Sequence, residues 1–182
     1  MNTERLRQLA NLLHADAANP NGVKFDLGVW ASPGDPTKTD EATSYKFDEP
    51  LPDLDLAHFD GAKVKPIQVS CNTFACALGL AALDPEFQKQ GLSYTFLHGH
   101  RDVWVGNMIP TFDGEMGWDA GAKFFGITVD DSRYFFDPDC YASTPREAEG
   151  ELFVAQRVEN FIDGIVEWDQ HPSNRDEDED EG

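Results

Sequence analysis

The chain has 182 residues, of which 40% are hydrophobic and 12% aromatic, enough to bury the core of a folded domain. Its 34 acidic residues outnumber 14 basic ones, and the net charge of −20 repels phosphates, so direct DNA or RNA binding is not expected. No apolar run reaches the roughly 18 residues of a membrane span, and neither a membrane span nor a secretion signal is expected. Three cysteines form no obvious disulfide framework, which favours reduced thiols and a cytoplasmic location.

The acidity belongs to the body of the chain as well as to its C-terminal end. Residues 169–182 carry a net charge of −6, so residues 1–168 still carry −14. We expect 1–168 to form a single α+β domain and 169–182 to form an acidic disordered tail. Such a surface favours a basic protein partner, although solubility alone is an alternative explanation of the charge.

The N-terminal part predicts a helix, a strand and a long loop. Apolar residues at spacings of three and four indicate a helix over 3–19, which the turn residues of 19–22 stop. Alternating apolar side chains indicate a half-buried strand over 23–29. Residues 32–62 are rich in Pro, Asp, Gly and Thr, and they predict a long surface loop.

An apolar segment of small side chains over 70–83 predicts the central helix of the fold. Asn72 or Thr73 is expected to cap its N-terminus. Gly79 shares one face with alanines at neighbouring turns, so other backbones should pack closely against this helix.

Shorter elements are expected after the central helix. Asp84 caps a short helix, and segments 92–97 and 103–105 form a β-hairpin. Two further helices are expected over 118–125 and 129–136, the second opened by a capping box.

The longest helix is expected near the C-terminus, giving more helix than strand overall. Thr144 and Glu147 have the spacing of a capping box that would open it. Its apolar stripe comprises Leu152, Val154, Val158, Phe161, Ile162, Ile165, Val166 and Trp168.

One hypothesis for the site is a catalytic thiol. Cys71 lies immediately before the expected helix start, where the helix dipole would lower a thiol pKa. His98 or His100, with Asp102, lies on the expected hairpin and would supply the base and its orienting group. The alternative is that Cys71 simply packs in the core.

The same residues have the types of a metal site. Cys71, Cys76, His98 and His100 form a C-x4-C…H-x-H set, and two histidines two apart on a strand face the same side. Around a helix start, however, the two cysteines diverge by more than a turn. We therefore expect no metal and no cofactor.

A second hypothesis for the site is an aromatic and acidic binding surface. Large apolar residues alternate with carboxylates around Gly-rich turns, a composition suited to a basic or aromatic partner. Core filling is the alternative explanation. The candidate binding residues are Trp30, Phe112, Asp113, Glu115, Met116 and Trp118.

Several short motifs follow one another in a recognisable order. They are an FD-x-x-x-W element at 25–30, a C-x-T-x-x-C-x-x-G-x-A segment at 71–81, an A-K-F-F-G-I-T segment at 122–128 and F-x-P at 136–138. Together they resemble a group of uncharacterised small bacterial and phage proteins. The chain departs from that pattern at Asn72, where glycine is usual, and in the long insertion after Trp30. The resemblance implies a shared fold and supplies no activity.

The leading functional hypothesis is an acidic, non-enzymatic protein-binding module. It would regulate or inhibit a nucleic-acid-handling protein by occupying that protein's basic surface. The alternative is a cysteine-dependent hydrolase or transferase that uses Cys71 with His98 or His100. Neither hypothesis fixes an oligomeric state.

Overall fold

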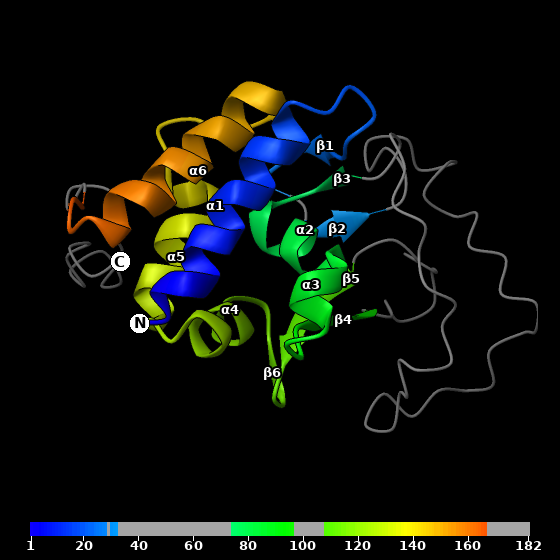
Figure 1. Cartoon of the computed structure of the whole chain (residues 1–182), viewed down its shortest axis with the longest axis vertical. Coiled ribbons are helices and arrows are strands. Elements are labelled where there is room, and N and C mark those ends of the chain that lie inside the picture. Colours follow the sequence, from blue (N-terminus) through cyan, green and yellow to red (C-terminus); the bar gives the residue numbers. More distant parts are fainter. Residues whose placement is uncertain (29, 33–73, 97–107, 167–182) are drawn as a thin grey trace, which may run out of the picture.

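The computed structural model describes residues 1–28, 30–32, 74–96 and 108–166. In these ranges, six helices and two small β-sheets form the α+β fold (Figure 1). The helices are α1 (Thr3–Ala17), α2 (Ala77–Leu83), α3 (Pro85–Gln88), α4 (Gly117–Phe125), α5 (Val129–Phe136) and α6 (Glu147–Ile162), with a 3-10 turn, η3 (Pro138–Cys140). The strands are β1 (Lys24–Phe25), β2 (Ala31–Ser32), β3 (Phe74–Ala75), β4 (Ser93–Phe96), β5 (Met108–Phe112) and β6 (Glu115–Met116). The predicted α+β class, with more helix than strand, is confirmed. In the described ranges no helix is long and apolar enough to cross a membrane.

The two sheets each have three strands. In the first, β3 lies between β1, to which it is parallel, and β2, to which it is antiparallel. In the second, β5 lies between β4 and β6, and both pairings are antiparallel. The strand predicted over 23–29 is therefore only the two residues of β1. The predicted hairpin is also revised, because β4 pairs with β5, whereas 103–105 lie outside the described residues.

Helix α2 lies at the centre of the fold, as the small-residue segment predicts. All seven of its residues are buried. The predicted cap at Asn72 or Thr73 was wrong, because β3 occupies the next two positions and keeps the backbone extended. The N-cap is Cys76, whose Sγ accepts a hydrogen bond from the Gly79 N–H at 3.3 Å.

Helices α1 and α6 pack side by side over most of their length (Figure 1). They run antiparallel, because the N-terminal end of α1 lies at the same end of the pair as the C-terminal end of α6 (Figure 1). The leucines on one face of α1 are fully buried, as are Val154 and Val158 of α6. The predicted stripe of α6 was too wide, since Leu152 is 43% exposed and Ile165 lies beyond the last helical residue and is 59% exposed.

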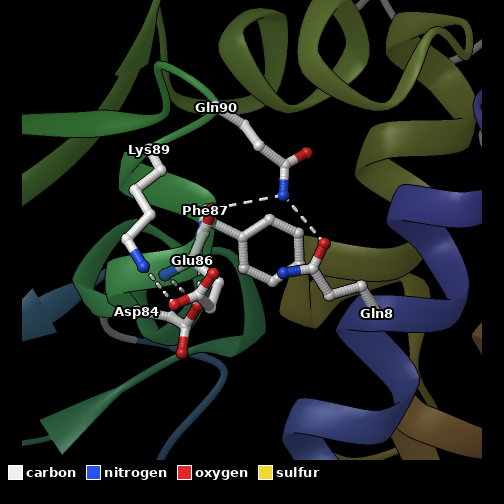
Figure 2. Close-up of polar contacts among 6 residues, drawn as sticks. All are labelled: Gln8, Asp84, Glu86, Phe87, Lys89 and Gln90. Carbon is white, nitrogen blue, oxygen red and sulfur yellow. Dashed lines mark hydrogen bonds and ion pairs between the residues drawn. The ribbon is translucent and has the colours of Figure 1, made fainter.

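A short polar network joins α1 to α3 (Figure 2). The carboxylate of Asp84 accepts from the N–H groups of Glu86 and Phe87, which confirms the predicted cap of α3. The amide of Gln90 donates to Gln8 Oε1 of α1 at 2.8 Å. These contacts fix α3 while its apolar residue, Phe87, fills the core.

The last two predicted capping boxes had different outcomes. Thr128 and Asp131 exchange side-chain and backbone hydrogen bonds at the start of α5, so that box is confirmed. The box predicted from Thr144 was wrong: Arg146 is the N-cap of α6 and makes no side-chain cap bond. The cause is tertiary, because Arg146 forms a β-bridge and an ion pair with Asp26, which keeps the chain extended up to that residue.

A buried arginine joins α6 to α5 and η3. Arg157 is 4% exposed, and its Nη1 donates to the carbonyl oxygens of Tyr134 and Cys140 at 2.9 and 2.8 Å. Its guanidinium carbon lies 3.7 Å from the ring centroid of Tyr141 and 4.3 Å from that of Tyr134. Aromatic faces and carbonyl oxygens thus replace the water that the cation loses on burial.

Candidate partner-binding face

The β5–β6 hairpin places two of the predicted binding carboxylates at one tip. Phe112 pairs with Glu115, so the turn consists of Asp113 and Gly114 alone. Their φ angles are 49° and 86°, the left-handed values that a two-residue hairpin turn requires and that Asp-Gly favours. Asp113 and Glu115 are both exposed there, on a tight turn of defined geometry.

Two tryptophans pack beside the start of α4, directly after the hairpin. The ring centroids of Trp30 and Trp118 are 5.6 Å apart, with the planes tilted by 58°. A Cβ on Gly117 would lie 3.4 Å from the Trp30 ring, so that ring covers the first residue of α4. Both tryptophans are half-buried and pack against the core. Each therefore leaves part of a large, rigid apolar surface exposed.

Met116 adds an exposed apolar side chain to this end of α4. It is the N-cap residue of α4, makes no side-chain cap bond, and is 54% exposed. We call the hairpin tip and the adjoining start of α4 the Trp30–Trp118 face; its residues are Trp30, Asp113, Glu115, Met116 and Trp118, with Glu115 at its rim on the other side of the hairpin from Met116. Its composition of aromatic residues and methionine, flanked by carboxylates, is typical of surfaces that bind proteins.

Phe112 lies on the opposite side of the hairpin from Met116 and packs at the edge of the core. Because the cross-strand partner of Met116 is Thr111, the side chains of Met116 and Phe112 point to opposite faces of the hairpin. Glu115 pairs with Phe112 and so lies on the Phe112 side of the hairpin, next to the tip. The Phe112 ring packs edge-on against Phe124 at 5.0 Å, and the Arg5 guanidinium lies 5.7 Å from its centroid. Its contacts are those of a residue at the edge of the core.

A lysine that the sequence hypotheses did not include controls the charge of the hairpin tip. The Nζ of Lys123 lies 2.8 Å from Asp113 Oδ2 and 3.8 Å from Glu115 Oε1, and it also donates to the Asp113 carbonyl oxygen at 2.9 Å. The hydrogen bond to Asp113 is the main reason that the pKa of Lys123 is raised. One ammonium thus faces two carboxylates, and the tip keeps a net negative charge.

The indole N–H of Trp118 is a polar group without an evident acceptor. Its Nε1 is buried and makes no hydrogen bond within the described part of the chain. The Arg133 guanidinium carbon lies 5.1 Å from the Trp118 ring centroid, and the Ser132 hydroxyl donates to the Trp118 carbonyl oxygen. The indole is therefore fixed by packing on α5 rather than by hydrogen bonds of its own.

The residues of the thiol hypothesis, Cys71, His98, His100 and Asp102, lie outside the described residues. Its premise of a helix start beside Cys71 was wrong, since α2 begins at Ala77. The cysteine that does cap α2 is fully buried, and burial raises the pKa of the Cys76 thiol to about 12. In the described ranges, no three His, Cys, Asp or Glu side chains gather as metal ligands.

No family model matches this chain, and neither the curated proteins nor the solved structures contain a match to it. The geometry of the Trp30–Trp118 face is therefore the basis on which a function can be argued. Of the predicted binding residues, the structure brings the rings of Trp30 and Trp118 together at the start of α4, directly after the hairpin that carries Asp113 and Glu115. Lys123 was missed, because the Asp-Gly pair predicts a tight hairpin but not which side chain of α4 will reach its tip.

Proposed function

We propose that this chain is an acidic protein-binding module that recognises a basic surface of another protein through the Trp30–Trp118 face. The observation that carries the proposal is Met116, a large apolar side chain that is 54% exposed at the start of α4, between the hairpin that bears the two carboxylates and the half-buried Trp118. A rigid apolar centre with charged groups at its rim is the arrangement of many protein interfaces.

The charge of the chain supports a basic partner. A net charge of −20 attracts basic proteins over a distance set by the salt concentration, and it speeds their encounter. The most strongly basic surfaces of proteins are often those that contact nucleic-acid phosphates. A bacterial or phage module that occupied such a surface would regulate or inhibit a nucleic-acid-handling protein, which is the function that we propose.

The test distinguishes recognition through the Trp30–Trp118 face from attraction by the net negative charge alone. The immobilised chain is used to capture basic proteins from a bacterial lysate at low salt, and each captured protein is then purified and titrated. The face variant is Asp113→Asn with Glu115→Gln. The control variant is Glu4→Gln with Glu149→Gln, which removes the same charge from exposed positions on α1 and α6.

We expect the face variant to bind the partner more weakly and with a shallower salt dependence than the control variant. Equal weakening in both variants would mean that net charge alone attracts the partner, and the face would have no role. If no basic protein is captured even at low salt, the proposed function is wrong.

A further inference from the structure

A buried carboxyl group lies on α6 where that helix packs against α1. The Glu151 side chain is 1% exposed, and its Oε1 has no hydrogen-bond partner within the described part of the chain. A carboxylate left ionised in such a place would lose its hydration without compensation. Burial therefore raises the pKa of Glu151 to about 8, and the charge of Asp16 acts in the same direction.

Asp16 holds the end of α1 and the turn that follows it. Its Oδ2 accepts a hydrogen bond from the Val23 N–H at 3.0 Å, which closes the turn over 18–23 that leads into β1. Burial also raises the pKa of Asp16, although the bond from Val23 works in the opposite direction. The group on α1 whose charge acts on Glu151 is therefore a second carboxyl group, and it has a structural task of its own.

Several other charged groups on the elements packed against α6 have partners elsewhere, and Glu4 and Arg7 of α1 are exposed. On α1, His14 pairs with Glu159 at 3.0 Å, and on α5, Arg133 pairs with the buried Asp137. The ammonium of Lys24 on β1 lies 5.1 Å from the Phe74 ring centroid. Beyond β1, Asp26 pairs with Arg146. The charge that acts on Glu151 is that of Asp16, and it has the same sign.

We propose that Glu151 is a proton-controlled latch between α6 and the C-terminal end of α1. With the proton bound, the neutral side chain packs against α1 and leaves Asp16 free to hold the 18–23 turn. Without the proton, two like charges face each other inside the interface, and this end of the α1–α6 pair loosens. The latch is independent of the Trp30–Trp118 face and would persist if that face bound nothing.

The sign of the pH effect follows from the raised pKa. Between its ordinary value of 4.5 and about 8, Glu151 keeps its proton in the folded chain and loses it in the unfolded chain. Over this interval each rise of one pH unit should increase the unfolding equilibrium constant by about tenfold through this group. Below this interval Glu151 contributes no pH dependence to the stability, because it is protonated in both states. Above the interval it is ionised in both states, and the stability lost through it no longer changes with pH.

The test compares urea unfolding of the wild type, Glu151→Gln and Glu149→Gln across this pH interval. A glutamine side chain resembles the neutral acid and cannot ionise, whereas Glu149 is an exposed glutamate two residues away on the same helix. The wild type and Glu149→Gln should lose stability in parallel as the pH rises. Glu151→Gln should lose less stability: for each rise of one pH unit, its unfolding equilibrium constant should increase about tenfold less than that of the wild type. Parallel curves for all three proteins would overturn the latch.

A local measurement keeps the proposal testable if Glu151→Gln folds poorly. Hydrogen exchange of the Val23 amide, corrected for its intrinsic pH dependence, reports opening of the turn that Asp16 closes. In the wild type its protection should fall as the pH rises through the same interval. In Asp16→Asn the protection of the Val23 amide should fall less as the pH rises. The ionised Glu151 then no longer has the like charge of Asp16 near it, so opening of the 18–23 turn is less favoured. A Val23 protection that is independent of pH in the wild type would contradict the latch.

Discussion

The carbonyl oxygen of Trp30 occupies the space that a side chain on Gly79 would need. An ideal Cβ on Gly79 would clash with that oxygen, and the same oxygen accepts a hydrogen bond from the Cys76 N–H at 3.2 Å. The backbone of Trp30 is thus held by the buried helix α2, while its ring covers Gly117 at the start of α4. The core and the Trp30–Trp118 face share this residue, so disturbing one should disturb the other.

Gly79→Ala should destabilise the fold strongly. The added methyl group meets backbone atoms that cannot rotate away, so we expect the free energy of unfolding to fall by about 3 kcal/mol or more, the upper end for overpacking. Gly28→Ala is the control, because the nearest group to its Cβ would be the Asp26 carboxylate, at 3.2 Å. Urea unfolding measures both variants, and similar midpoints would mean that α2 and Trp30 do not pack this closely.

Gly114→Ala should weaken the hairpin through its backbone alone. Among the described residues, apart from its chain neighbours, none has an atom within 4 Å of a Cβ at this position, but φ is +86°, a conformation that costs an L-residue about 1–2 kcal/mol. Gly114→Asn should lose less stability, since asparagine tolerates left-handed conformations better than alanine. Thermal unfolding of the two variants provides the comparison. Equal losses would indicate a contact of the side chain rather than backbone strain.

Arg157→Met should lower the free energy of unfolding by about 2–4 kcal/mol, because the carbonyl oxygens of Tyr134 and Cys140 lose their buried donor. Methionine keeps most of the apolar volume between the tyrosine rings, so the loss reports on the hydrogen bonds and the cation–π contacts of the guanidinium together. Arg7→Met makes the same change at an exposed position of α1 and should be nearly neutral. If the two variants unfold alike, Arg157 contributes no net stability.

Cys76 should resist alkylation until the protein opens. The thiolate is the reactive form, and burial raises the pKa of this thiol to about 12, so the folded chain holds almost none of it at neutral pH. Iodoacetamide labelling, followed by mass spectrometry of the digested protein, should show Cys76 modified only when urea is added. Rapid labelling of Cys76 without urea would contradict its burial. The same digest reports on Cys71, where rapid labelling would support the thiol-enzyme hypothesis.

Features with a purely local cause were predictable from the sequence. The Thr128 and Asp131 capping box and the Asp84 cap depend on residues three or fewer apart, and both are present. The burial of α2 followed from a run of small apolar side chains in an acidic chain.

Features set by distant pairing were not predictable. The start of α2 depends on β3 pairing with β1, which lies far earlier in the chain, and no local pattern encodes that register. Glu151 lies among other glutamates on α6, and tertiary packing rather than any local pattern makes it the buried one. Of the candidate face, composition identified the tryptophans and carboxylates, but not the separation of Phe112 or the ion pair with Lys123.

The central claim is that the Trp30–Trp118 face, and not net acidity, recognises the partner. The most direct measurement is the dissociation constant for the captured basic protein at high salt, where long-range attraction is screened. It is determined for the wild type, Met116→Ser and Leu152→Ser. The two variants each shorten one exposed apolar side chain, 54% and 43% exposed, and leave the charge unchanged.

We expect Met116→Ser to weaken binding by roughly 5–30-fold, as truncation of an interface anchor does, and Leu152→Ser to leave it unchanged. A wild-type affinity for both variants, or a loss confined to Leu152→Ser, would contradict the claim that this face binds the partner.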